Sequence, residues 1–361
     1  MIFFQKTKKY WLVLGALVLT WVLLRHDAII YQQPVGQVVH ETARLTQKTT
    51  DEHGNTDKIY SQRLTIKLLN RNKTVTLSNQ YADSQTVTHR YHVGDQLLLD
   101  GTGKLRILSL KRDATIGVLL GLLVSLLLLY VKWRATSWLL LSLIINIILF
   151  VLALVIDINV KNANVLLIFV ILAVLVAFSS LALVLGRTLQ MVVTLASTLL
   201  ATLLAMILML VSLKVTANEG VHFETMSYVT QVPTTLFIAQ TIIGVLGAVM
   251  DESADIVAAL FGMRREKIAH HFKDYWHAGM NVGRDIMGTL VNVLFMIFIA
   301  ETMPMVFLML RNGNNWPYIL DQIMNLGILQ TVVSGIGIVI AVPVTSALVA
   351  LIVKHQQVVK S

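Results

Sequence analysis

Carboxylate side chains recur in the second half of this chain beside glycines, in segments that are otherwise strongly apolar. Gly244 and Gly247 precede Asp251 and Asp255. Steps of three and four residues place these four on one face of a helix. Small residues let a second helix approach closely, and intramembrane carboxylates are typical of cation or proton sites. The alternative is that Asp251, Glu252 and Asp255 only cap a helix end in the headgroup layer.

A second polar face is predicted further along the chain. Asp285, Gly288 and Asn292 repeat the three- and four-residue spacing. Arg284 and Asp285 are expected at the start of a helix, where the helix dipole favours an acidic side chain. We expect Arg284 to pair with an aspartate of the first face, and Asp285 to help gate the cytoplasmic mouth of a pathway.

Glu301 lies about two thirds of the way across its apolar segment, at 1.5 Å per residue. An ionised carboxylate at that depth is costly unless it is paired, protonated or hydrated. Pro304 clashes with the carbonyl group of Ala300, which predicts a kink beside Glu301. A carboxyl group at a kink suits a cation or proton site. The alternative is a hydrated position near the outer interface.

Metal and catalytic chemistry are not predicted. His270, Asp274 and His277 share one helical face, but a helix on the membrane surface with aromatic residues at headgroup level explains them better. The chain has no HExxH, GxSxG or P-loop motif, and residues 101–104 read as a turn. It has no cysteine, so thiolate chemistry is excluded. We expect no enzyme activity, no catalytic residue, no metal and no cofactor.

The elements that must position these residues are membrane helices. The 361 residues are 56% hydrophobic and only 14% charged, whereas soluble proteins have roughly 25% charged residues. The mean hydropathy is +0.71, which indicates that lipid covers much of the surface. The net charge of +9 fits cationic loops facing an anionic leaflet, so the bilayer is the expected partner and nucleic acid is not.

The chain is predicted to have three parts: an uncleaved signal-anchor helix (1–33), a β-rich extracytoplasmic domain (34–112) and a seven-helix membrane domain (113–361). The predicted fold is therefore an α-helical polytopic membrane protein of about eight transmembrane helices with a small all-β domain. Short alternating stretches and turn signals favour a small barrel or sandwich, with an OB-like barrel as one form. Strands are expected at 35–39, 64–68, 74–77, 91–99 and 105–110.

Lysine and arginine positions predict the orientation. They concentrate in the segments that alternate crossings would place inside, whereas the short outer loops hold only Lys161, Lys214 and Arg311. Cytoplasmic loops are enriched in such residues. We therefore expect a plasma-membrane protein with both termini in the cytoplasm and residues 34–112 outside.

The membrane region has two unlike halves. Residues 137–213 are rich in leucine, valine, isoleucine and alanine, which predicts a lipid-facing scaffold. Residues 233–353 are polar and glycine-rich, so any functional centre is expected there. The glycines expected to pack helices together are Gly244, Gly247, Gly283, Gly288, Gly335 and Gly337.

Two stretches resemble one family. Residues 244–251 (GVLGAVMD) and 277–292 (HAGMNVGRDIMGTLVN), with Gly335, Gly337 and Pro343, are similar to the YibE/YibF-like membrane proteins, in particular to the longer, YibE-type members with an outer domain. The resemblance implies a transport or efflux role without a defined substrate, and a complex with a shorter relative. Its signature positions would be Asp251, Gly283, Arg284, Asp285, Gly288 and Asn292. Glu301 lies where the family commonly has glycine or serine.

The leading hypothesis is a transporter or efflux permease subunit whose polar centre is formed by Asp251, Arg284, Asp285, Asn292 and Glu301. The alternative is a membrane assembly or signalling protein that does not transport, and whose outer β domain binds a partner. An enzyme acting on lipid is a weaker third. The expected partner is the shorter relative or a second copy of the chain.

Overall fold

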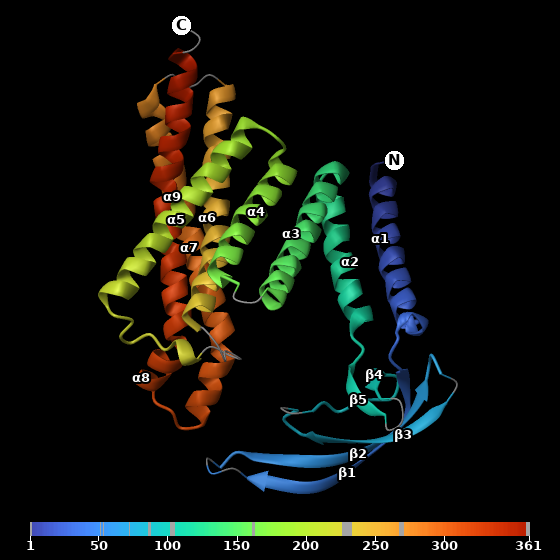
Figure 1. The fold of residues 1–361 in the computed structure, drawn as a ribbon. Helices are drawn as coiled ribbons and strands as arrows, with labels where there is room; N and C mark the ends of the chain where they lie inside the picture. The colour runs from blue at the N-terminus through green and yellow to red at the C-terminus, as the bar shows by residue number, and fades with distance from the viewer. Residues whose placement is uncertain are drawn as a thin grey trace. The chain divides into compact units, whose positions relative to one another are not determined.

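The computed structural model describes residues 2–358 except 51, 53, 72, 86–87, 102–104, 161–162, 226–232 and 267–270. Within this range it describes the backbone alone, without side chains, for residues 2–9, 12 and 354–358. The chain divides into two compact units, Met1–Thr136 and Ser137–Ser361. The first unit holds two long helices and a β-sheet, and the second is a helix bundle (Figure 1). The predicted fold class, a polytopic helical protein with a small β domain, is confirmed.

In the first unit, helices α1 (Ile2–Arg25) and α2 (Asp113–Tyr130) pack against each other. Two glycines of α2 make the close approach possible. A β-carbon at Gly117 would collide with the Leu24 side chain of α1, and one at Gly121 would lie 3.2 Å from Leu17 Cδ2. The short helix η1 (Ala28–Ile30) leads from α1 into the sheet.

The β-sheet has five strands: β1 (Val35–Thr50), β2 (Thr56–Leu68), β3 (Thr74–Ala82), β4 (Gln96–Asp100) and β5 (Arg106–Leu110). The pairings are antiparallel, in the order β3-β2-β1-β4-β5, and β3 also lies near β5. This is the arrangement of a partly open, five-stranded OB-type barrel. The paired ends of β1 and β2 extend beyond β4 as a long hairpin (Figure 1).

Alternation in β2 places its apolar side chains in the domain core, as the sequence predicted. Leu64 and Ile66 are fully buried, while Thr65 and Lys67 point the other way. The strand predicted over 91–99 is wrong in its first half. Gly94 has a φ of 97°, and Asp95 accepts a hydrogen bond from the backbone N–H of His92 (2.7 Å), so a turn precedes β4.

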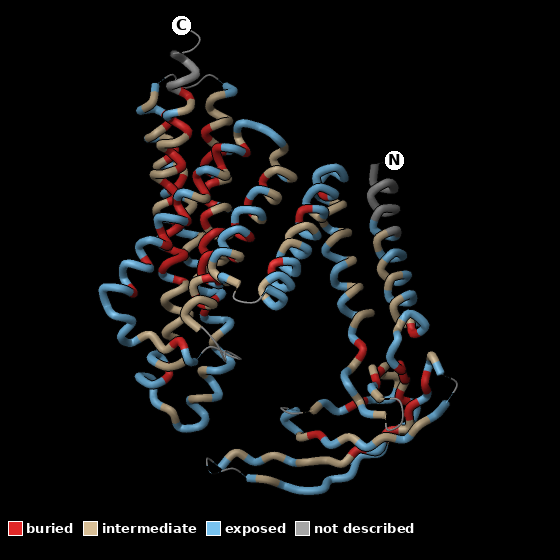
Figure 2. Tube along the Cα trace, viewed as in Figure 1, coloured by how far each residue is buried: buried red, intermediate tan, exposed pale blue. Residues whose placement is uncertain are grey.

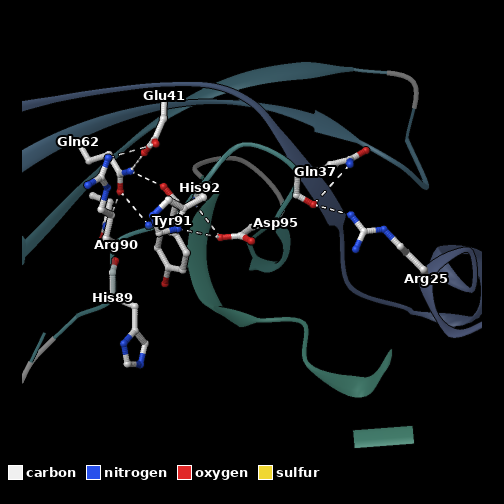
Figure 3. Close-up of polar contacts among 11 residues, drawn as sticks. Arg25, Gln37, Glu41, Gln62, His89, Arg90, Tyr91, His92 and Asp95 are labelled. Atoms are coloured by element: carbon white, nitrogen blue, oxygen red, sulfur yellow. Dashed lines mark hydrogen bonds and ion pairs between the residues drawn. The ribbon is translucent and has the colours of Figure 1, made fainter. Parts of the chain in front are cut away.

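Gln62 fixes the segment between β3 and β4 onto the sheet (Figure 3). It is fully buried, and its amide nitrogen donates to the Glu41 carboxylate and to the Tyr91 carbonyl oxygen (2.5 Å). Its Oε1 accepts from the backbone N–H of Tyr91 and from Asn79 Nδ2, both at 3.2 Å. Arg90 lies 3.5 Å from Glu41. All the hydrogen-bonding capacity of this buried amide is used, as a structural role requires.

Lys111 joins the ends of α1, β5 and α2. Its Nζ lies 2.6 Å from Asp27 Oδ1 and 2.7 Å from Asp113 Oδ2, and it donates to the Leu24 carbonyl oxygen at 2.5 Å. Tyr31 donates to Asp113 (2.8 Å), and its ring centre lies 5.3 Å from Nζ. Burial and then the contact with Asp113 raise the pKa of Tyr31 to about 12, so its hydroxyl stays a donor at physiological pH.

The second unit contains most of α3 (Trp133–Asn159), then α4 (Val165–Leu185), α5 (Leu189–Val215), η2 (Phe223–Thr225), α6 (Pro233–Arg265) and α7 (Phe272–Arg311). It ends with α8 (Trp316–Tyr318), the π-helical segment η3 (Ile319–Met324) and α9 (Asn325–Val358). Helix α9 packs against α5, α6 and α7, and α4 packs against α5 and α6. Buried positions concentrate along α5, α6 and α9 (Figure 2).

Seven helical stretches among the described residues are long and apolar enough to cross a bilayer: α2 to α7, and the continuous stretch Trp316–Val353. The eighth predicted crossing, α1, has a shorter apolar part, Val13–Arg25. Helices α3 and α4 expose many large apolar side chains, such as Ile147 and Leu167. Lipid is the solvent that suits such a surface, so this is a membrane-spanning protein.

Candidate functional site: a buried polar layer

A carboxyl group lies inside the bundle on α6. Glu252 has no exposed surface and shares a helical face with Val245, Val249 and Ile256, which are also fully buried. Its neighbour Ser253 is fully buried as well. Both positions are therefore held within the bundle by the packing of the apolar side chains one turn before and one turn after them.

Helix α5 presents a row of hydroxyl groups to the interior of the bundle. Thr194, Ser197, Thr198 and Thr202 are buried and stand at relative positions i, i+3, i+4 and i+8, which places them on one face of the helix. Ala201 and Ala205 complete the same face. The prediction that residues 137–213 form only a lipid-facing scaffold is wrong for α5, because this helix packs against α4, α6 and α9.

Helix α9 contributes two further buried hydroxyl groups. Thr345 donates to Ser253 Oγ at 3.2 Å, which links α9 to α6. Ser346 donates to the carbonyl oxygen of Val342 in its own helix at 2.7 Å, and its side chain lies against Gly279 of α7. The polar groups therefore come from three helices that pack on one another.

These hydroxyl and carboxyl groups form a polar layer between two apolar cores. The first core includes Ala201, Ala205, Val245, Val249 and Ala341. The second core includes Val193, Ile256, Leu260, Val342 and Val349. On α6, Glu252 and Ser253 lie between Val249 of the first core and Ile256 of the second, and on α5 the hydroxyl groups begin directly after Val193 of the second core. We define the polar layer as these buried residues of α5, α6 and α9: Thr194, Ser197, Thr198, Thr202, Glu252, Ser253, Thr345 and Ser346.

Gly337 fixes the depth at which the three helices meet. A β-carbon there would lie 2.9 Å from Val249 Cγ2, 3.0 Å from Val245 Cγ1 and 3.5 Å from Ala205 Cβ. Val249 is three residues from Glu252, so the polar layer begins within one turn of this contact.

Part of the polar layer lacks hydrogen-bond partners. Within the part of the chain that the structure describes, both carboxyl oxygens of Glu252 and the hydroxyls of Ser197, Thr198 and Thr202 are buried with no partner. Each such group costs about 1–3 kcal/mol of stability, and more if it is charged. The layer offers only oxygen atoms and one acidic group, which is the chemistry of a site for a proton or a hard cation.

The residues that the sequence pointed to lie elsewhere. Asp251 is exposed on α6, and Arg284, Asp285, Asn292 and Glu301 are exposed on α7. No ion pair joins Arg284 to Asp285 or to the α6 aspartates among the described residues, although such a pair with α6 was expected. The structure therefore does not bring these five side chains together.

The predicted packing glycines differ in their surroundings. A β-carbon at Gly283 would collide with Val342, and Gly337 lies at the three-helix contact described above. A β-carbon at Gly244 would lie 2.9 Å from Gln330 Nε2, and one at Gly335 would lie 3.8 Å from Val291 Cγ1. A β-carbon at Gly247 or Gly288 would meet no other side chain within 4 Å.

The histidine-containing segment at the start of α7 forms no metal centre among the residues that the structure describes. His270 lies outside the described residues. Asp274 accepts a hydrogen bond from the backbone N–H of His271 (2.9 Å) and forms a capping box at the start of α7. No group of three or more histidine, cysteine or acidic residues able to hold a metal ion occurs in the described ranges.

Comparison with protein families assigns nearly the whole chain. Residues 29–110 match the model described as the YibE/F family N-terminal domain, and residues 119–355 match the model described as YibE/F-like protein. The chain belongs to the YibE/F-like family. No curated protein and no solved structure matches this YibE/F-like protein significantly. The family resemblance predicted from the GRDIMG stretch and its neighbours is thereby confirmed.

Sequence reasoning missed the centre of the polar layer in this YibE/F-like protein. Glu252 was grouped with Asp251 and Asp255 as a possible headgroup-layer residue. Two signals point to it: its three- and four-residue spacing from Val249 and Ile256, and the regular hydroxyl spacing on α5. Neither signal depends on glycines, which had directed attention to α7.

Proposed function

We propose that this YibE/F-like protein is a subunit of a membrane transporter, and that the polar layer around Glu252 binds the ion that it moves or that drives it. The supporting observation is a sealed carboxyl group without a partner where α5, α6 and α9 meet. A bundle that served only as an anchor would be more stable with well-packed apolar side chains there. Intramembrane ionisable groups commonly mark ion pathways.

The proposed orientation places this layer nearer to the cytoplasm. We propose a plasma-membrane protein with both termini inside and residues 34–112 outside, on the distribution of lysine and arginine. Helix α5 then begins at the cytoplasmic side with Leu189. Thr198 lies about 14 Å along the helix from Leu189 at 1.5 Å per residue.

The test is ion flux in proteoliposomes that carry trapped proton-, sodium- and potassium-sensitive dyes. We expect Glu252→Gln, which keeps the side-chain shape but cannot ionise, to reduce flux to background. Asp251→Asn, at the exposed neighbouring position, is the matched control and should retain flux. Full flux in Glu252→Gln together with loss in Asp285→Asn would instead place the site on the exposed residues of α7.

We also propose that a second membrane subunit, either another copy or a shorter family relative, covers the polar side of α7. Arg284, Asp285 and Asn292 are exposed there among apolar residues, and polar groups facing lipid are costly. With an added oxidant, the cysteine of Asn292→Cys should then form a disulfide with the same cysteine of a second copy, or with a cysteine introduced into the co-expressed relative. If Asn292→Cys forms no disulfide with either partner and reacts fully with a lipid-soluble maleimide, lipid covers this side of α7.

A second candidate function belongs to the outer domain. A groove of about 590 Å³ lies along β3 and β5 and is lined by residues such as Ser78, Gln80 and Arg106. Both strands are at the edges of the sheet, so their outer backbone groups are available to pair with an extended chain. If the protein is an assembly factor instead, Arg106→Glu should abolish its cellular activity while Glu252→Gln leaves it intact.

A further inference from the structure

Among the residues that the structure describes, no positive charge is paired with Glu252 to balance an ionised carboxylate. Helix α4 has no charged residue, and α9 has none between Asn325 and Val353. Helix α5 has only Lys214, in its last turn, and Glu224 of η2 lies beyond that same end of the bundle. The nearest charged residues in sequence, Asp251 and Asp255, are acidic and exposed.

Helix α7 does not supply a counter-ion either. Arg284 and Asp285 are exposed, and no ion pair between α7 and Glu252 occurs among the described residues. The titratable group of α7 that is buried against α6 is Tyr275, which belongs to the second core with Ile256 and Leu260. Its hydroxyl is neutral at physiological pH, so it does not balance a carboxylate.

We propose that Glu252 binds a proton, that its carboxyl group is therefore neutral while the polar layer is sealed, and that this proton is the ion carried or coupled in transport. The claim that this proton is carried or coupled rests on the proposed function, whereas the claims that Glu252 binds a proton and is neutral do not. Burying an unpaired carboxylate costs far more than burying the neutral acid, which loses only a hydroxyl and a carbonyl group to the interior.

A proton fits this layer better than a sodium ion does. A metal ion needs several oxygen atoms turned toward it and a space of its own. Thr345 is already bonded to Ser253, and Ser346 and Thr194 donate to carbonyl oxygens of their own helices at 2.7 and 2.9 Å. A proton adds no volume to a packed interior and needs only the carboxyl oxygen itself.

The unbonded hydroxyl groups of α5 have a role when Glu252 releases its proton. When the layer opens to water, the Glu252 carboxyl O–H bond breaks, the proton leaves to a water molecule and a carboxylate remains. Ser197, Thr198 and Thr202 have no partner in the sealed form. They are the available O–H donors that would stabilise the carboxylate until it takes up the next proton.

The first test uses dicyclohexylcarbodiimide, which reacts with protonated carboxyl groups in apolar surroundings. The acid proton moves to one carbodiimide nitrogen while the carboxyl oxygen bonds to the central carbon. The adduct then rearranges to a stable N-acylurea, and nothing leaves. We expect mass spectrometry of the full-length protein in proteoliposomes to find this adduct on Glu252 and not on Asp251. Labelling should fall as pH rises and should be insensitive to sodium at constant pH.

A second measurement does not depend on access of the reagent. The infrared carbonyl band of a protonated carboxyl group should be present in the wild type and in Asp251→Asn, and absent in Glu252→Gln. Gel filtration and thermal melting of the three proteins establish that all are folded. Absence of both the adduct and the band at every pH would overturn the proposal. Protection of Glu252 by sodium at fixed pH would also overturn it, because the site would then bind a metal cation.

The two proposals fail separately. If the band belongs to Glu252 but Glu252→Gln transports normally, proton binding stands and the assignment of transport to this layer is wrong. If Glu252→Gln abolishes flux but the wild type shows no protonated carboxyl group, the transport site stands and the proton assignment is wrong.

Discussion

Gly337 shows what a missing side chain contributes at the meeting point of α5, α6 and α9. Its hydrogen atom occupies the space where a β-carbon would come within 2.9 Å of Val249 Cγ2. Val249, Val245 and Ala205 cannot retreat easily, because they belong to the first apolar core. The separation of three helices therefore depends on this one position.

We expect Gly337→Val to destabilise the bundle by about 1–3 kcal/mol, the usual effect of overpacking a core. Thermal melting of the full-length protein in detergent measures this. Gly288→Val is the matched control, since Gly288 is also helical on α7 but has no neighbour within 4 Å. Equal melting temperatures for the two variants would show that Gly337 does not set the helix separation.

At the residue scale, the sequence showed which residue types matter but not the direction in which each side chain points. Glycines and acidic residues directed the predictions to α6 and α7, yet Asp251 and Glu252 are adjacent and one is exposed while the other is fully buried. Consecutive residues point about 100° apart in a helix. The sequence pattern of α6 alone does not show which of these two side chains faces a neighbouring helix. That depends on α5, whose hydroxyl row was read as scaffold.

At the scale of elements, the loop between α5 and α6 is joined to the π-helical segment before α9. His222 lies between two carboxylates: its Nδ1 is 3.0 Å from Glu224 Oε1, and its Nε2 is 3.0 Å from Asp321 Oδ2. Asn325 also donates to the Gly220 carbonyl oxygen. With an acceptor at each ring nitrogen, the imidazole is best satisfied when both nitrogens carry a proton.

This contact is expected to depend on pH. The hydrogen bond with Glu224 and then the charge of Asp321 raise the pKa of His222 above its usual value of about 6.5. Its contribution to the contact is therefore full below that value and is lost as pH rises through the raised one. Hydrogen exchange of residues 219–225, corrected for intrinsic rates, should show protection at acidic pH that fades as pH rises through the raised pKa of His222. His222→Gln should remove this pH dependence.

Element boundaries were predicted least well where polar residues continue a helix. The continuous apolar part of α7 begins only near Ile286, but the helix itself begins at Phe272. The capping box of His271 and Asp274 starts the helix well before its apolar part. Strand β1 likewise runs to Thr50 because it pairs with β2 far beyond the apolar residues of the core. The extension of β1 is mostly exposed, and the extension of α7 buries only Tyr275, Gly279 and Gly283 among polar and exposed residues. Hydropathy alone therefore does not reveal either extension.

At the scale of the whole molecule, composition was enough to predict the class, and the family assignment covers both the β domain and the helices. The proposed topology has a direct test, because the chain has no cysteine of its own. Lys73→Cys, in the turn between β2 and β3, should react with a membrane-impermeant maleimide on intact cells. Arg187→Cys, between α4 and α5, should react only after permeabilisation. The reverse pattern would invert the orientation.

The contacts of Lys111 affect how the β domain is attached to its two helices. The sheet is entered from α1 and left through α2, and one ammonium group ties Asp27 after the first helix to Asp113 at the start of the second. Because the two connections are joined by this ion pair, the sheet resists rotation about either of them. A rotation of the sheet would therefore be passed to α1 and α2 together and not to one of them alone.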